Sequence, residues 1–167
     1  CGKIVSAAGV KFEELAVNDI VAFRHDNEKI RDFRALHDGN LIANYRADGI
    51  IFSSAMGSTA YTLAAGGPLV HPSLNVIVLT PICAHSLFTK PLVIPPEDEV
   101  AIETLGDEDP LLVTFDGAHR VVMGAGDRLI VSTFHESLKV YMPEQADFYR
   151  VLREKFQHGY VYGEDNA

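Results

Sequence analysis

Hydrophobic positions in this chain come in short runs separated by turn residues, and most runs are too short to form a helix. Residues 99–105 alternate, with Val100, Ile102 and Thr104 opposite Glu99, Ala101 and Glu103, which is typical of a half-buried strand. The run at 50–52 is continuous, as in a strand buried on both faces. Together these patterns predict strands at 3–5, 12–15, 17–23, 30–37, 40–45, 50–52, 76–81, 91–95, 99–105, 111–115, 119–123, 129–134 and 138–141.

Turn and helix signals between the strands predict two hairpins and two helices. Asp-Gly pairs at 38–39 and 116–117 predict two hairpins. A short helix is expected at 60–65, and a longer one at 145–156, where aromatic and leucine side chains recur every four residues. Because strands do not alternate with long helices, a Rossmann sheet is disfavoured. We predict a mainly β fold, a two-sheet sandwich-like domain with these two helices.

The rest of the chain is organised around residues 48–72. A short apolar strand leads into a turn of small and hydroxylated residues, then into the short helix, which Gly66, Gly67 and Pro68 end. Such a turn presents backbone N–H groups and hydroxyls that can hold phosphate or ribose oxygens. Judged from the pattern alone, helix capping is the commoner reason for this composition.

Composition limits the possible functions. The 167 residues are 47% hydrophobic, enough for one globular domain with a core. The net charge of −9 disfavours a nucleic-acid surface, which needs clustered Lys and Arg. Cys1 and Cys83 form no disulfide framework, and Cys83, in an apolar stretch, is expected to be buried. No signal peptide or membrane span is visible, so a cytoplasmic protein without membrane partners is expected.

One string is more specific than any of these patterns. Gly57-Ser58-Thr59-Ala60-Tyr61, followed by Ala65-Gly66-Gly67-Pro68 and preceded by Asp48-Gly49, closely resembles the nucleotide-binding signature of the NAD kinase family. The resemblance covers roughly residues 15–156 and is to the family's carboxy-terminal domain. It implies an enzyme that phosphorylates the adenosine ribose 2′-hydroxyl of NAD to give NADP. We therefore expect this domain at 1–157 and a polar tail at 158–167.

The resemblance also implies which residues bind the acceptor NAD. An Asn-Asp pair, an aspartate before a buried strand and the Thr-Ala-Tyr segment carry this role in the family, and nearby positions contribute. Carried onto this sequence, the NAD-binding residues are Asn18, Asp19, Lys29, Arg46, Asp48, Met56, Thr59, Ala60, Tyr61, Thr62, Leu63 and Ala64. The same residue types are also common in positions that bind no ligand. Asp48 suits a turn, Tyr61 suits the core, and Lys29 is equally well explained as a solvated strand charge.

Three positions depart from the family pattern. Met56 replaces a small polar residue, and it could either contact an adenine face or narrow the pocket. Ala64 lacks a hydroxyl that the family often has. Ala118 lacks the amide of the Asp-Gly-Gln hairpin that Asp116 and Gly117 otherwise resemble.

The family's catalytic motif, Gly-Gly-Asp-Gly, does not occur in the 167 residues, so no catalytic residue is assigned here. In the family this motif lies in an amino-terminal α/β domain, which we expect upstream of this chain. The chain alone is therefore predicted to be inactive. The resemblance implies ATP or polyphosphate as donor, Mg²⁺ or another divalent cation bound with the donor phosphate, and a homodimer or homotetramer. No metal ligands are predicted within the chain.

Three other interpretations stay open at this stage. A related lipid kinase of the diacylglycerol or sphingosine type has a similar β domain, although the string at 57–68 disfavours it. A non-catalytic nucleotide-binding module would use the same stretch without any upstream domain. A purely structural β domain would bind neither NAD nor NADP.

Overall fold

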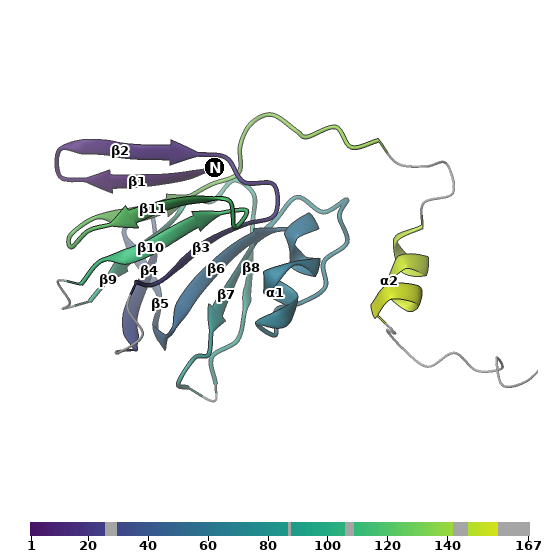
Figure 1. The fold of residues 1–167 in the computed structure, drawn as a ribbon, viewed down its shortest axis with the longest axis horizontal. Coiled ribbons are helices and arrows are strands. Elements are labelled where there is room, and N and C mark those ends of the chain that lie inside the picture. The colour runs from purple at the N-terminus through teal and green to yellow at the C-terminus, as the bar shows by residue number, and fades with distance from the viewer. Residues whose placement is uncertain (26–29, 87, 106–108, 142–146, 157–167) are drawn as a thin grey trace, which may run out of the picture. The chain divides into compact units, whose positions relative to one another are not determined.

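The computed structural model describes residues 1–25, 30–86, 88–105, 109–141 and 147–156. Strands dominate this part of the chain, and Figure 1 shows them as a layered β structure. In chain order the strands are β1 (Gly2–Ser6), β2 (Gly9–Glu14), β3 (Asp19–Arg24), β4 (Arg31–His37), β5 (Asn40–Ala47), β6 (Gly49–Ser54), β7 (Ile77–Ile82), β8 (Leu92–Ile94), β9 (Val100–Thr104), β10 (Leu111–Phe115), β11 (His119–Met123) and β12 (Arg128–Val131). The helical segments are a 3₁₀ turn, η1 (Met56–Thr59), and the α-helices α1 (Tyr61–Ala64) and α2 (Phe148–Phe156).

The described strands form two six-stranded sheets. The first sheet has the order β2-β1-β12-β9-β4-β5, and the second has the order β11-β10-β3-β6-β7-β8. Every pairing between neighbouring strands is antiparallel. Both predicted Asp-Gly hairpins are present, as β4–β5 and β10–β11. The predicted two-sheet β fold is confirmed.

One hydrophobic core joins the two sheets. Its buried side chains come from the first sheet, such as Phe33 and Ile102, and from the second, such as Phe52, Leu79 and Phe115. Because side chains alternate across a strand, this core uses only one face of the second sheet. The helical segments η1 and α1 and the candidate functional site lie on the opposite face of that sheet.

A smaller cluster lies on this opposite face. Ala55, Val70 and Val78 are buried there, with Val76 packed against them. Figure 1 shows α1 beside β6 and β7, after the turn that ends β6. The predicted strand, small-residue turn and short helix are therefore all present at 49–64.

Two local predictions were wrong. Cys83 is exposed, because β7 ends at Ile82 and the chain turns there with Cys83 at a φ of +48°. Residues 138–141 form no strand, and Leu138 and Tyr141 are 63% and 103% exposed. Among the described residues, none of the strand pairings includes 138–141, and apolar character alone does not make a strand without backbone hydrogen-bond partners.

The chain divides into two compact units, Cys1–Ser137 and Leu138–Ala167. The first contains both sheets and both hydrophobic clusters. Of the predicted helix at 145–156, residues 148–156 are helical as α2, while 145 and 146 lie outside the described residues. The predicted tail at 158–167 also lies outside them. None of the helices described is long and apolar enough to cross a membrane.

Candidate functional site

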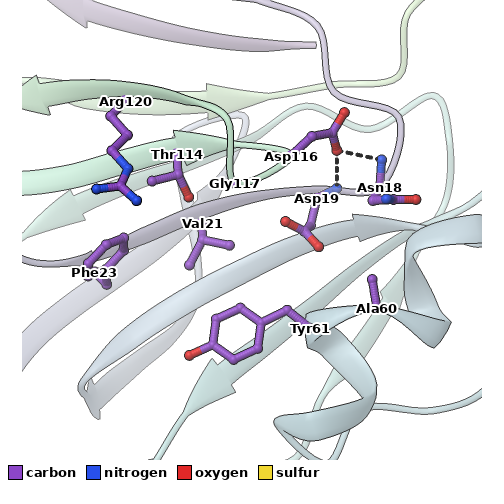
Figure 2. A pocket seen from close by; sticks show the side chains of 10 residues that line it. All are labelled: Asn18, Asp19, Val21, Phe23, Ala60, Tyr61, Thr114, Asp116, Gly117 and Arg120. Atoms are coloured by element: carbon purple, nitrogen blue, oxygen red, sulfur yellow. Dashed lines mark hydrogen bonds between the residues drawn. The ribbon is translucent and has the colours of Figure 1, made fainter.

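An open pocket lies on the face of the second sheet that turns away from the core. Its volume is about 370 Å³, within the range of small-molecule sites. Figure 2 shows side chains from β3, β10, β11 and the start of α1 around it. The lining residues are Asn18, Asp19, Val21, Phe23, Ala60, Tyr61, Thr114, Asp116, Gly117 and Arg120.

Strand register explains how distant residues meet here. Thr114 on β10 pairs with Val21 on one side and with Arg120 on the other. Directly opposed residues in a sheet point to the same face, so all three side chains face the pocket. On β3, Ile20 and Ala22 enter the core while their neighbours Asp19, Val21 and Phe23 line the pocket.

Residues 17–19, which lead into β3, place Asn18 and Asp19 in the pocket. Three consecutive backbone N–H groups of this segment donate to the carboxylate of Asp116. The N–H of Val17 donates to Oδ2 at 2.7 Å, and those of Asn18 and Asp19 donate to Oδ1 at 2.7 and 3.0 Å. The last two bonds are drawn in Figure 2. Asp116 in turn donates its own N–H to the carbonyl oxygen of Asp19, at 2.9 Å.

The same segment is held from its other side by the end of β6. The Ser54 hydroxyl donates to the Val17 carbonyl oxygen at 2.7 Å, and the Ser54 N–H donates to the Asn18 carbonyl oxygen at 3.0 Å. Gly57 packs so closely that a Cβ there would lie 2.0 Å from that Asn18 oxygen. A side chain at 57 would therefore displace the backbone that presents Asn18 and Asp19.

Asp19 is the most buried charged group of the pocket, with 8% of its surface exposed. Burial raises the pKa of its carboxyl above 3.8, and the nearby negative charge of Asp116 raises it further. The backbone N–H of Tyr61, at the start of α1, acts in the opposite direction and lowers this pKa. A ligand hydroxyl or a cationic group near Asp19 would stabilise the ionised carboxylate in the same way.

The pocket thus contains acidic, aromatic and basic side chains. Asp19 and Asp116 are acidic, Tyr61 offers an aromatic face that is 47% exposed, and Arg120 supplies a cation. Figure 2 shows Arg120 and Asp19 in different parts of the pocket, with Val21 between them. A ligand with hydroxyls, an aromatic ring and a phosphate would find a partner for each group.

Of the predicted NAD-binding residues, Asn18, Asp19, Ala60 and Tyr61 line this pocket together. The others on η1 and α1 do not. The Thr59 hydroxyl donates to the Met56 carbonyl oxygen at 3.1 Å, and Met56 is 39% exposed. Thr62 is fully buried, Leu63 is half-buried and Ala64 is exposed.

The remaining predicted residues lie elsewhere. Asp48 follows β5, and its carboxylate lies 3.5 Å from the Arg24 guanidinium. Arg46 is exposed on β5, which is an edge strand of the first sheet. Lys29 lies outside the described residues.

Sequence reasoning assigned no NAD-binding role to several of the lining residues, which are Val21, Phe23, Thr114, Asp116, Gly117 and Arg120. Of these, Asp116 and Gly117 indicate in the sequence only a turn that resembles the family's Asp-Gly-Gln hairpin. Alternation along 19–23 could have indicated Val21 and Phe23, since they share a face with Asp19. The Asp-Gly turn could have indicated Arg120, because it fixes the hairpin register that pairs Arg120 with Thr114. The pairing of β10 with β3 joins segments that are distant in sequence, and no local sequence pattern predicts it.

A divalent cation has no evident protein ligands here. Across the described ranges, no group of three or more His, Cys, Asp or Glu side chains could hold a metal ion. The residues present therefore do not fit a metal site of their own, and we assign no metal ligand to them.

A known protein family matches most of this chain. The family described as the ATP-NAD kinase C-terminal domain matches residues 17–142, which include every lining residue of the pocket. The chain belongs to this NAD kinase family. The NAD kinase of Delftia acidovorans is 36% identical over 155 residues, which are 93% of this chain and 52% of that protein. The NAD kinase of Cupriavidus pinatubonensis is 39% identical over 155 residues, 93% of this chain and 50% of that protein.

The chain spans about half the length of the curated relatives it matches. Solved structures share its fold. Yeast NADH kinase, solved in complex with NADH, aligns with a TM-score of 0.82 and 24% identity over 99% of this chain and 51% of its own. An NAD kinase from Archaeoglobus fulgidus, solved in complex with ATP, aligns with a TM-score of 0.62 and 27% identity over 77% of this chain and 49% of its own. The lipid-kinase interpretation is not favoured by these matches.

Proposed function

We propose that this chain forms the NAD-binding half of an NAD kinase, which phosphorylates the adenosine ribose 2′-hydroxyl of NAD to give NADP. The pocket carries the proposal, because it joins Asn18 and Asp19 to Ala60 and Tyr61. These are the two segments that the family resemblance assigns to the acceptor nucleotide. They are far apart in sequence and meet only in the folded chain.

The pocket side chains have simple roles in this proposal. The Asp19 carboxylate accepts a hydrogen bond from a ribose hydroxyl, and Asn18 offers an amide donor and acceptor beside it. The Tyr61 ring packs against a planar ring of the dinucleotide. Arg120 offers a charge-assisted hydrogen bond to a phosphate oxygen.

Phosphoryl transfer also needs a donor and a group that orients the attacking hydroxyl. We propose that ATP or polyphosphate is the donor, and that a Gly-Gly-Asp-Gly motif in the other half of the family's length supplies the catalytic aspartate. The ATP complex of the Archaeoglobus relative supports ATP. A divalent cation bound with the donor phosphates would neutralise their charge. The chain alone would then bind NAD without turning it over.

The same resemblance supports an assembly of two or four copies, which light scattering would measure. A cytoplasmic location is proposed with it, because NAD and ATP are both available there. Neither point affects the binding test below.

Calorimetric titration of the chain with NAD tests the proposal. We expect saturable binding that Tyr61→Ala weakens by roughly tenfold, the effect of losing one to two kcal/mol of aromatic contact. Tyr141→Ala is the matched control, because Tyr141 is also exposed but lies in the other compact unit. A wild-type chain that binds neither NAD nor NADP contradicts the proposal. NADP formation from NAD and ATP by the chain alone would contradict its predicted inactivity.

A further inference from the structure

We infer that Asp116 is a positioning residue for NAD binding, because its carboxylate holds the backbone of residues 17–19 in the shape that presents Asn18 and Asp19 to the pocket. This inference rests on the proposed function. Asp116 lies on the turn between β10 and β11, about a hundred residues further along the chain than the segment that it holds.

The hydrogen bonds indicate a structural clamp rather than a ligand contact. An ionised carboxylate offers about four lone-pair positions, and three of them are used by the N–H groups of Val17, Asn18 and Asp19. Bonds from backbone N–H groups to a charged acceptor are among the stronger hydrogen bonds in proteins. A segment whose three consecutive amides are fixed in this way has little freedom to reorient.

The backbone of the turn directs the carboxylate. Asp116 and Gly117 have φ values of +48° and +66°, both left-handed, as the tightest hairpin turns require. The Ala118 N–H closes the turn by donating to the Phe115 carbonyl oxygen at 3.0 Å. The position of the Asp116 side chain therefore follows from the hairpin and not from its own rotamer alone.

Ser54 and Gly57 complete the clamp from the opposite side. The hydroxyl and N–H of Ser54 hold the carbonyl oxygens of the segment, while Asp116 holds its N–H groups. The Ser54 hydroxyl also accepts the Gly57 N–H at 3.0 Å, which ties the segment to η1. The segment 17–19 thus depends on two other parts of the chain, whose bonds to Val17 span 37 and 99 residues of sequence.

Another turn of this chain serves as a control for substitution of Asp116. Asp38-Gly39 is a second Asp-Gly turn, with φ values of +49° and +76°, at the end of the β4–β5 hairpin. The Asp38 side chain is 77% exposed, and its carboxylate lies 3.6 Å from the His37 ring. Replacing Asp38 changes the same kind of turn without touching residues 17–19.

The experiment compares the wild-type chain with Asp116→Ala, Asp116→Asn and Asp38→Ala. Titration with NAD gives the dissociation constant, and amide NMR follows the N–H groups of Val17, Asn18 and Asp19. Asp116→Ala should raise the dissociation constant at least roughly tenfold, since small displacements of binding groups are costly. It should also remove the hydrogen-exchange protection of those three amides. Asp38→Ala should leave the dissociation constant within about twofold.

Asp116→Asn keeps the turn, since asparagine tolerates left-handed φ, and its carbonyl oxygen still accepts hydrogen bonds. Partial rescue of NAD affinity and of amide protection is therefore expected. Should Asp116→Ala fail to fold, Asp116→Asn must by itself weaken NAD binding more than Asp38→Ala does. If the wild type binds NAD and the Asp116 variants bind it as tightly, the positioning role is refuted while the proposed function stands. If the wild type does not bind NAD, the proposed function fails, and this inference fails with it.

Discussion

Asp19 shows how a single residue can be placed for ligand binding at a cost to folding. Its carboxylate is buried beside a second carboxylate, that of Asp116, and both features disfavour the ionised form. A surface aspartate would have a more stable charge but could not meet a ligand inside the pocket. We interpret this unfavourable placement as a consequence of the proposed role.

The raised pKa of Asp19 has a consequence for stability against pH. The folded chain binds this proton more tightly than the unfolded chain, whose aspartate titrates near 3.8. The contribution of Asp19 to stability is therefore greatest below pH 3.8 and is lost as the pH rises through the raised pKa. Asp19→Asn cannot ionise, so its stability relative to the wild type should increase from acid to neutral pH.

Urea unfolding of both chains across this pH range measures the effect. Glu99→Gln, which also removes one carboxylate but at an exposed position, is the control for the change in net charge. Parallel stability profiles for Asp19→Asn and the wild type would contradict the prediction.

At the scale of elements, the pocket depends on how η1 and α1 are attached to the second sheet. Both are very short, four residues each, so they have little stability of their own. The buried Ser58 side chain attaches them to the following loop. Its hydroxyl accepts the Val70 N–H at 3.0 Å and donates to the Val70 carbonyl oxygen at 3.3 Å.

Ser58→Ala removes both of these bonds and leaves buried backbone groups of Val70 without partners. We expect a loss of about 1–3 kcal/mol in the free energy of unfolding. Ser6→Ala is a closely matched control. The Ser6 hydroxyl likewise accepts an N–H, from Ala8 at 3.1 Å, and donates to a carbonyl oxygen, that of Gly9 at 3.3 Å, but these two bonds are exposed to solvent.

The control variant should lose no more than about 0.5 kcal/mol, because water replaces its partners. Chemical denaturation of the two variants and the wild type gives the comparison. Equal losses for Ser58→Ala and Ser6→Ala would show that burial of the Ser58 hydroxyl does not matter. NAD affinity should fall in Ser58→Ala but not in Ser6→Ala, because the pocket residues Ala60 and Tyr61 lie two and three positions after Ser58 in the chain.

At the scale of the whole molecule, both sheets, both hydrophobic clusters and the pocket lie within Cys1–Ser137. The family match ends at residue 142, close to the end of this unit. Residues 138–167 form the second compact unit, with Leu152 as its buried apolar residue among those described. The proposed domain end at 157 therefore differs from the end of the sandwich.

A chain that ends at Ser137 should keep the sandwich and the pocket. The described residues of both hydrophobic clusters lie within 1–137, so we expect cooperative thermal unfolding with a Tm within about 4 °C of the full chain, and unchanged NAD affinity. A second truncation after residue 157 tests the proposed domain end. If only the longer chain unfolds cooperatively, the domain needs residues 138–157 and the boundary at 157 is correct.

The sequence by itself determined the class of fold and most of its strands. Strand alternation, buried apolar runs and Asp-Gly turns are local signals, because each depends on side chains a few residues apart. They predicted both hairpins and the strand, turn and helix at 49–64. The local signals failed at Cys83, which is exposed at a turn directly after β7, and at 138–141, which are exposed and belong to none of the described strands.

Only the tertiary structure decided which residues share the pocket. The family resemblance pointed to residues 18, 19, 60 and 61 among its twelve, but no local pattern placed Arg120 and Thr114 beside Val21 or aimed Asp116 at the amides of 17–19. These contacts follow from the order β11-β10-β3-β6 in the second sheet. Strand order depends on the packing of the whole core, so it is a property of the complete chain and not of any short stretch.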